Sequence, residues 1–550
     1  MSPALIQLED FSARSPERME AARPVLDRLK SFEPGAAVRE EMVLPSLSAG
    51  EQYRFHIDLR RCIGCRCCEV ACNEQNNNPP TVKWRRVGEI EGGSYPHTHR
   101  LHISMSCNHC LEPSCLEGCP VDAYEKLPNG IVKHHADTCI GCQYCTWNCP
   151  YGVPQYHEER HIVTKCHLCV DRLEAGALPA CVEACPTRAI EVEAVNVADW
   201  RQAIAEGNAP GVPPADLTFS TTRITVPEGL PQDMGKSEPW QLEPEAPHWP
   251  LVFLLVLVQW SVGLFALVLG GGLFGAATPT MLHWGALGAF VLGQIALAAS
   301  AFHLGRPIHA LRAVRAWRRS WLSREALSFL IFGAMGIVPA AAAALDAFGF
   351  STTSSESRLV QLLLGLTTLA GAAGVVSGIG IYRIPARPAW DTWRTPVQFS
   401  LTAALLASLS GLVVIAAAGW SDGAVTRGRA ATVFLGAVAA LSAILQAALP
   451  WTLVASGLAG DSASLRSTAI LLTRRFPRCL WLRTLLPIIA AGAAVLAGTS
   501  SSQARALSFA VAAIVAAFAG EIIGRFLFFV TVVPRNMPGS FFGRNAPGGH

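Results

Sequence analysis

The sequence predicts a two-part protein, in which a small cysteine-rich α+β domain precedes an all-α bundle of eight membrane-spanning helices. Of the 18 cysteines in the 550-residue chain, all except Cys479 lie between Cys62 and Cys185. From Trp249 onward the chain consists of long runs of Leu, Ala, Val, Ile, Phe and Gly, separated by short arginine-bearing loops. The formal net charge of +3 is too small to indicate a nucleic-acid partner.

Changes in composition divide the chain into five parts. Residues 1–50 form a polar arm, in which Ser15 before Pro16 predicts the start of a short helix that reaches about Lys30. This arm is either a partly ordered tail or a docking arm for a partner subunit. The remaining parts are the cysteine-rich domain at 51–198, a proline-rich linker at 199–248, a membrane anchor at 249–533 and a tail at 534–550.

The anchor contains eight apolar segments. Each is close to or above the roughly 20 residues that a helix needs to cross a bilayer. Buried helices of soluble proteins are usually shorter and amphipathic, so this pattern favours a membrane bundle over a large soluble core. The segments are 251–274, 281–302, 325–347, 358–382, 397–420, 430–457, 481–499 and 506–532.

Four groups of four cysteines carry the chemistry of the first domain. Three closely spaced thiolates in one loop can bind three corners of a cubane, and the displaced fourth cysteine, often followed by proline, binds a neighbouring cluster. The groups therefore predict a ferredoxin-like α+β fold with tandem bacterial-ferredoxin modules and four [4Fe–4S] clusters. They are Cys62, Cys65, Cys68 and Cys72; Cys107, Cys110, Cys115 and Cys119; Cys139, Cys142, Cys145 and Cys149; and Cys166, Cys169, Cys181 and Cys185.

Zinc is the main alternative for any one group. A zinc knuckle uses two separated cysteine pairs, whereas the first and third groups each place four cysteines in an eleven-residue run. Four such groups in sequence favour iron–sulfur clusters. We interpret Cys67 as a non-ligand and His109, between two ligands, as a neighbour of a cluster that does not bind it.

Three stretches resemble the four-cluster subunit of dimethyl sulfoxide reductase and related molybdopterin oxidoreductases. They start at Cys107 (CNHCLEPSC), Cys139 (CIGCQYC) and Cys149 (CPYGVPQY), and the resemblance covers about 52–198. It implies that each cluster takes three cysteines from one group and one from another. The implied sets are Cys62, Cys65, Cys68 and Cys185; Cys166, Cys169, Cys181 and Cys72; Cys107, Cys110, Cys115 and Cys149; and Cys139, Cys142, Cys145 and Cys119.

The membrane half resembles the anchor subunit of the same enzymes, which implies that two separate subunits of the family are fused here. The resemblance rests on HLGRP from His303, SWLSRE from Ser320, YRIP from Tyr382, PAW from Pro388 and GRFLF from Gly524. In that family a His and a Glu at these positions are implicated in quinol handling. The candidate residues for menaquinone or ubiquinone are His303, Arg306, Arg324 and Glu325.

The chemical needs of a quinone indicate His303 and Glu325 as well, but a structural role at the helix ends is an alternative for both. A quinone needs an apolar slot with polar groups that bind its carbonyls and pass protons, and ionisable groups at membrane depth are functional candidates. A His at a helix C-terminus and a Glu in a first turn also suit the helix dipole. We expect no haem, because His283 lies at the opposite membrane face from His303 and the two cannot pair.

The distribution of arginine predicts the orientation in the inner (cytoplasmic) membrane. Sixteen arginines lie in the loops and tail on the side of both termini, and four lie on the other side. The positive-inside rule then places the cluster domain in the cytoplasm. The N-terminus has neither an apolar signal core nor a twin-arginine pair, which favours the same orientation.

These features predict an electron-transfer and membrane-anchor subunit that works with a molybdopterin-containing catalytic partner and the quinone pool. The molybdopterin belongs only to the partner, since no domain for it fits in this chain. One alternative is an ion-coupled anchor, although Glu521 is the only acid well inside a helix. Another is a redox sensor, for which four clusters would be excessive. Sulfite, sulfoxide, nitrate and polysulfur compounds all remain possible substrates, and a cytoplasmic domain favours sulfite by analogy alone.

Overall fold

The computed structural model describes residues 43–236, 242–274, 279–350, 358–418, 425–460 and 462–535. The helix predicted at 15–30, most of the polar arm and the tail from residue 536 lie outside these residues. From Pro45 onward, the described chain forms one compact unit that includes the cysteine-rich domain and the long helices. The predicted order of an α+β part followed by a helical part is confirmed.

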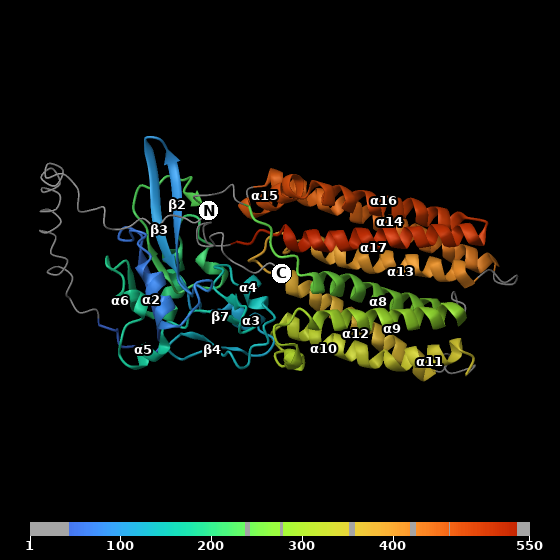
Figure 1. Cartoon of the computed structure of the whole chain (residues 1–550), viewed down its shortest axis with the longest axis horizontal. Helices are drawn as coiled ribbons and strands as arrows, with labels where there is room; N and C mark the ends of the chain where they lie inside the picture. The colour runs from blue at the N-terminus through green and yellow to red at the C-terminus, as the bar shows by residue number, and fades with distance from the viewer. Residues whose placement is uncertain are drawn as a thin grey trace, which may run out of the picture. The chain divides into compact units, whose positions relative to one another are not determined.

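The cysteine-rich domain is built from short strands and short helices around the cysteine loops. One three-stranded sheet has the order β8-β1-β9, with β8 antiparallel and β9 parallel to β1, and the second has the order β10-β2-β3. β2 and β3 form a long hairpin (Figure 1). The strands of these two sheets are β1 (Glu51–Asp58), β2 (Arg86–Ser94), β3 (His97–Met105), β8 (Ile190–Asn196), β9 (Arg223–Thr225) and β10 (Gly235–Lys236).

The cysteine loops themselves are bounded by two small hairpins and five short helices. Burial here is supplied largely by the cysteines and a few apolar side chains such as Val121, Val132 and Ile162. The hairpins pair β4 (Tyr124–Lys126) with β5 (Val132–His134), and β6 (Gln155–His157) with β7 (Ile162–Thr164). The helices are α2 (Cys67–Gln75), α3 (Ser114–Gly118), α4 (Tyr144–Asn148), α5 (Val170–Glu174) and α6 (Ala180–Glu183).

The segment predicted to be a linker at 199–248 differs from that prediction. It includes the end of α7 (Val197–Gln202) and contributes β9 and β10, one strand to each three-stranded sheet. Trp200 is buried, and its indole N–H donates to the Ser220 carbonyl at 2.8 Å. The prolines flank the two strands and do not lie within them, so the strand N–H groups stay available for pairing. Much of this segment therefore belongs to the cysteine-rich domain.

Within the described residues, eight helical spans are long and apolar enough to cross a membrane, as the sequence predicts. They lie side by side as a bundle (Figure 1). The third span is divided at Gly336 into two helices. The spans are α8 (Trp249–Leu273), α9 (Pro279–Ala301), α10 (Trp321–Met335) with α11 (Ile337–Ala347), α12 (Arg358–Tyr382), α13 (Arg394–Ala418), α14 (Val425–Ala459), α16 (Pro477–Thr499) and α17 (Gln503–Val530).

The loops that join these helices on the cysteine-domain side also contain helical turns. A 3-10 helix, η4 (Pro307–Val314), precedes α10, and α15 (Ala463–Ile470) with the π-helical turn η5 (Leu471–Arg475) precedes α16. α10 begins at Trp321 because Ser320 caps it, accepting a hydrogen bond from the Ser323 N–H. These elements place the candidate quinone residues at one end of the bundle.

Candidate functional site

The four C-x2-C loops share one backbone conformation. The residue before the second cysteine of each loop has a left-handed backbone, with φ of 71° at Gly64, 44° at His109, 70° at Gly141 and 56° at Leu168. Glycine adopts this conformation freely, whereas a residue with a Cβ pays roughly 1–2 kcal/mol for it. The chain therefore bears a small backbone cost at His109 and Leu168 to keep the same loop shape.

This shape turns backbone N–H groups toward the sulfur atoms. The N–H of Gly141 donates to Cys139 Sγ at 3.4 Å, and that of Leu168 donates to Cys166 Sγ at 3.4 Å. The equivalent bond from His109 to Cys107 is 3.5 Å long. Such bonds favour a charged thiolate over a neutral thiol, as a cluster ligand requires. The repeated conformation and its N–H···S bonds fit cluster ligands better than structural thiols.

The fold brings the sixteen cysteines together in the four sets that the resemblance implied. Two of these sets each surround a cavity of about 20 Å³, and the exposed side chain of Ile63 lies beside the set that contains Cys62. In the other two, burial and then the charges of the three other thiols raise the pKa of Cys72 and of Cys145. Set A is Cys62, Cys65, Cys68 and Cys185; set B is Cys72, Cys166, Cys169 and Cys181; set C is Cys107, Cys110, Cys115 and Cys149; and set D is Cys119, Cys139, Cys142 and Cys145.

Each set offers four sulfur donors, the ligand number of a [4Fe–4S] cluster. Cys67 is exposed at the start of α2 and belongs to none of the four sets. His109 is buried, and its Nδ1 accepts a hydrogen bond from the Val132 N–H at 3.0 Å. Burial holds the pKa of His109 well below its usual value. That neither residue is a cluster ligand stays a prediction.

Neighbouring sets are linked in the order A, B, C, D. The thiols of Cys68 in set A and Cys181 in set B lie near each other, as do those of Cys166 in set B and Cys107 in set C. The buried Tyr124 lies near thiols of both set C and set D. The four candidate cluster sites therefore form a continuous series through the domain.

Set D lies against the ends of the membrane helices. The N–H of Arg306 donates to the Ile140 carbonyl at 3.0 Å, and the Ser320 hydroxyl donates to the Gly118 carbonyl at 2.7 Å. The Tyr144 hydroxyl donates to the Ile381 carbonyl of α12 at 3.0 Å. These backbone and side-chain hydrogen bonds attach the loops around set D to the bundle.

A cavity of about 270 Å³ lies where set D meets the bundle. Its walls are mostly apolar, with Leu and Phe side chains from α8, α9 and α10, and its polar lining includes His303, Glu325 and Tyr382. Cys142 of set D also lines it. Ligand pockets combine apolar walls with a few polar groups, and this volume is just below the usual range of about 300–1,000 Å³.

Glu325 occupies an unusual position for a carboxylate. Its side chain is 8% exposed, and within the described residues it has no hydrogen-bonding or ion-pair partner. Gly378 of α12 makes room for it, since a Cβ there would lie 2.6 Å from Glu325 Oε1. A buried carboxyl group without a partner is costly unless it is neutral or has a ligand. The structure thus brings Glu325 and His303 to the same cavity.

His303 lies in an aromatic cluster that links the two parts of the chain. Its ring centroid is 6.3 Å from that of Trp147 on α4, between the ligand candidates Cys145 and Cys149, and 5.3 Å from that of His248. His248 directly precedes α8, and its sequence position gave no sign that it would lie beside His303. Trp147 and Tyr144, which line the same cavity, also went unnoticed, because no spacing in the sequence signals contacts between the domains.

The reason given for the absence of haem therefore needs correction. His283 lies within 3.6 Å of Asp346, but His303 does have a histidine neighbour in His248. A haem bound by two histidines needs the porphyrin plane between the rings, whereas these rings contact each other edge to face at an angle of 79°. The absence of haem stays a prediction, now on this different ground.

The two candidate arginines are not among the residues that line the cavity. The Arg306 guanidinium donates to the Ala136 carbonyl at 3.1 Å and so joins the bundle to the cysteine-rich domain. The Arg324 guanidinium donates to the Trp317 carbonyl at 3.0 Å and lies over the Trp321 ring. One helical position separates Arg324 from Glu325, which rotates the two side chains by about 100°. The geometry favours docking and capping roles for these arginines.

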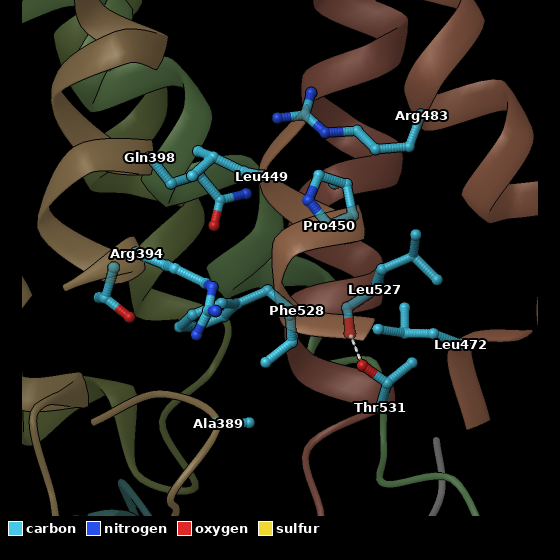
Figure 2. A pocket seen from close by; sticks show the side chains of 13 residues that line it. Ala389, Arg394, Gln398, Leu449, Pro450, Leu472, Arg483, Leu527, Phe528 and Thr531 are labelled. Carbon is cyan, nitrogen blue, oxygen red and sulfur yellow. Dashed lines mark hydrogen bonds between the residues drawn. The ribbon is translucent and has the colours of Figure 1, made fainter. Parts of the chain in front are cut away.

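A second polar region lies among α13, α14, α16 and α17. Arg483 forms an ion pair with Glu521 at 2.8 Å, and both side chains are fully buried. A cavity of about 70 Å³ lies beside it, with Arg394 and Gln398 of α13 on one side and Arg483 of α16 on the other (Figure 2). This cavity is far below the volume of usual ligand pockets. Sequence reasoning noted Glu521 but missed its partner, since Arg483 was counted as a loop residue.

Comparison with known proteins divides the chain at the same place. Residues 98–195 match the 4Fe-4S dicluster domain, and residues 243–530 match the DMSO reductase anchor subunit (DmsC). One chain of the anaerobic dimethyl sulfoxide reductase of Escherichia coli is 43% identical over 148 residues, which are 26% of this chain and 72% of that protein. One subunit of the sulfite dehydrogenase of Allochromatium vinosum is 38% identical over 160 residues, 25% of this chain and 67% of that protein. One subunit of the tetrathionate reductase of Salmonella typhimurium is 42% identical over 141 residues, 25% of this chain and 56% of that protein.

The cysteine-rich domain and the eight apolar helices define a multi-pass membrane protein that holds iron–sulfur clusters and transfers electrons. The chain belongs to the DMSO reductase anchor subunit family, with the iron–sulfur domain fused ahead of the anchor on one polypeptide. The predicted fusion of two family subunits is confirmed.

Proposed function

We propose that this chain carries electrons between a molybdopterin-containing catalytic subunit and membrane menaquinone or ubiquinone, through four [4Fe–4S] clusters. The observation that carries this proposal is the cavity of about 270 Å³ that Cys142 shares with His303 and Glu325. A quinone ring there would lie beside a ligand of set D and beside two groups able to exchange protons. Each bound cluster would supply one-electron redox chemistry.

The order of the sets supports a path for electrons between the quinone cavity and the surface at set A. Set D adjoins the quinone cavity, and set A is three steps away along the series. Cys65 of set A is exposed, and the apolar side chains of Ile63 and Val70 beside it are 61% and 62% exposed. Exposed apolar side chains next to a redox site suit contact with another protein. The catalytic partner would therefore dock at set A.

The relatives narrow the substrate class but do not select one compound. Their names refer to dimethyl sulfoxide, sulfite and tetrathionate, all of which are small oxidised sulfur compounds. We propose the same class for the partner of this chain, with either direction of electron flow. The alternative of an ion-coupled anchor has less support, because Glu521 is held in an ion pair with Arg483. A redox sensor would have no use for the cavity.

The purified protein should contain about 16 iron atoms, four for each of four cubanes. Anaerobic addition of a menaquinol analogue should reduce these clusters, because the cavity places the quinol beside Cys142. Iron analysis and electron paramagnetic resonance before and after quinol addition measure both quantities. Iron near half that value in reconstituted protein would contradict the four-cluster proposal, and full iron with no reduction by quinol would contradict the quinone proposal.

The cysteine-rich domain should face the cytoplasm. Of the sixteen arginines on that side, Arg306, Arg312 and Arg319 bond to the domain and Arg387 and Arg483 are buried, so their charges do not report topology. Eleven remain against four, which still satisfies the positive-inside rule. A green fluorescent protein fused after His550 should therefore fluoresce, while alkaline phosphatase fused there should be inactive. The reverse result would overturn this orientation.

A further inference from the structure

Two basic side chains lie between neighbouring cysteine sets, buried and without a carboxylate partner. Arg85 is 0% exposed and Lys165 is 3% exposed. In the described part of the chain, no Asp or Glu lies within ion-pair distance of either residue. An unpaired buried charge costs several kcal/mol, so such residues are rare unless a counter-charge is present. The described carboxylates do not supply that counter-charge.

Arg85 lies between sets A and B. The thiols whose charges act on it are those of Cys181, Cys166 and Cys72 in set B and of Cys68 in set A. Its Nη1 donates to the Ser104 hydroxyl at 3.1 Å, and that hydroxyl lies 3.3 Å from Cys68 Sγ. Because the hydroxyl oxygen accepts from Arg85, its hydrogen is free to point at the sulfur. The guanidinium thus acts on set A directly and through Ser104.

Lys165 occupies the corresponding place between sets B and C. The thiols whose charges act on it are those of Cys107 and Cys115 in set C and of Cys166 in set B. Its Nζ donates to the Cys166 carbonyl at 2.9 Å and to Cys107 Sγ at 3.6 Å, and it also contacts the Val132 carbonyl. These acceptors hold the ammonium group in one position. Lys165 directly precedes the ligand candidate Cys166 in the chain, and its ammonium group donates a hydrogen bond to the ligand candidate Cys107.

We infer that Arg85 and Lys165 are the fixed counter-charges of the clusters and that they raise the reduction potentials of the sites on either side of them. This inference rests on the proposed four-cluster function. A [4Fe–4S] cluster with four thiolates is anionic, and reduction adds one negative charge. A buried cation stabilises the more negative form more strongly, because Coulomb interaction in a low-dielectric interior is large. Set B lies between the two cations, sets A and C each adjoin one of them, and set D adjoins neither Arg85 nor Lys165.

Removing the charges should therefore leave a specific pattern. Arg85→Met should lower the potentials of clusters A and B, and Lys165→Met should lower those of B and C. Each affected reduction equilibrium should shift at least tenfold, which is 59 mV for a one-electron couple. Cluster D should not move in either variant. Potentiometric titration followed by electron paramagnetic resonance gives the potentials, and single-ligand Cys→Ser variants assign each signal to a set.

Charge-retaining variants separate this effect from simple structural damage. Arg85→Lys and Lys165→Arg should keep potentials close to those of the wild type, even where they lower stability. Arg172→Met provides a matched control. Arg172 lies near Cys169 of set B, but Glu183 neutralises it and its side chain is 27% exposed, so the shift should be less than about threefold.

Two results would overturn the inference alone. The first is full iron content with potentials unchanged in both methionine variants, and the second is an equal shift of all four clusters, D included. Lys165→Met tests the inference even if Arg85→Met fails to fold. Wild-type iron well below about 16 atoms would overturn the four-cluster function together with this inference.

Discussion

Replacing Glu325 by glutamine should slow electron exchange between a quinol analogue and the clusters at least tenfold, equivalent to about 1.4 kcal/mol on the barrier. Quinol oxidation releases protons as well as electrons, and glutamine keeps the size of the side chain but cannot accept a proton. Glu325 is buried at a mostly apolar cavity and has no partner in the described structure. Stopped-flow reduction of the clusters by the quinol analogue measures the rate.

His303→Ala should produce a similar loss, because it removes the ring that lies in the cavity wall beside Trp147. Both variants should keep all four clusters and remain in the membrane. Glu245→Gln is a matched control: this carboxylate is paired with Arg387 at 3.2 Å and does not line the cavity, so the rate should stay within about twofold.

A purely structural role for Glu325 predicts a different result. Glu325 is the fifth residue of α10, just beyond its first turn, so its carboxylate would stabilise the helix dipole by less than about 1 kcal/mol, and its loss would lower stability slightly without slowing quinol oxidation. Normal rates in both Glu325→Gln and His303→Ala would therefore reject the quinone site. They would leave the series of cluster sites unaffected, since no cysteine changes.

The ligand groups and the helices were predictable from the sequence because both depend on local spacing. Each group starts with a C-x2-C pair and has two further cysteines within the next 16 residues, which indicates a cluster loop, and an apolar run of about 20 residues indicates a membrane helix. The loop geometry was only partly predictable. Gly64 and Gly141 suit a left-handed position, but His109 and Leu168 adopt it against their intrinsic preference.

The contacts that complete the quinone cavity could not be predicted in the same way. Tyr144 and Trp147 belong to a cluster loop, and they reach the cavity because backbone bonds at Ile140 and Gly141 attach that loop to the end of α9. Such docking between domains leaves no periodic pattern in the amino-acid sequence. The same holds for β9 and β10, which pair with strands more than 140 residues earlier in the chain. Burial of Arg85 and Lys165 also depends on this long-range folding.

Arg483 was counted among the loop arginines, but it forms a buried ion pair with Glu521 inside the helix bundle. In the described part of α13, α14, α16 and α17, three charged side chains are fully buried, namely Arg483, Glu521 and Arg525. Arg483 donates to Glu521, while Arg525 donates to Gln259 at 2.7 Å and to Thr402 at 3.2 Å. Glu521 is the single negative charge of this cluster, so it balances one arginine and attracts the other.

Glu521→Gln should accordingly lower the free energy of unfolding by about 3–5 kcal/mol, because it leaves two guanidinium groups buried without a counter-charge. Arg525→Met should cost clearly less, since the pair of Arg483 and Glu521 would survive and the cluster would become neutral. Asp391→Asn removes a partly exposed pair with Arg383 and should cost less than about 1 kcal/mol. Unfolding in mixed detergent micelles, monitored by circular dichroism, compares the three. Equal losses for Glu521→Gln and Arg525→Met would show that packing and not charge balance holds these helices together.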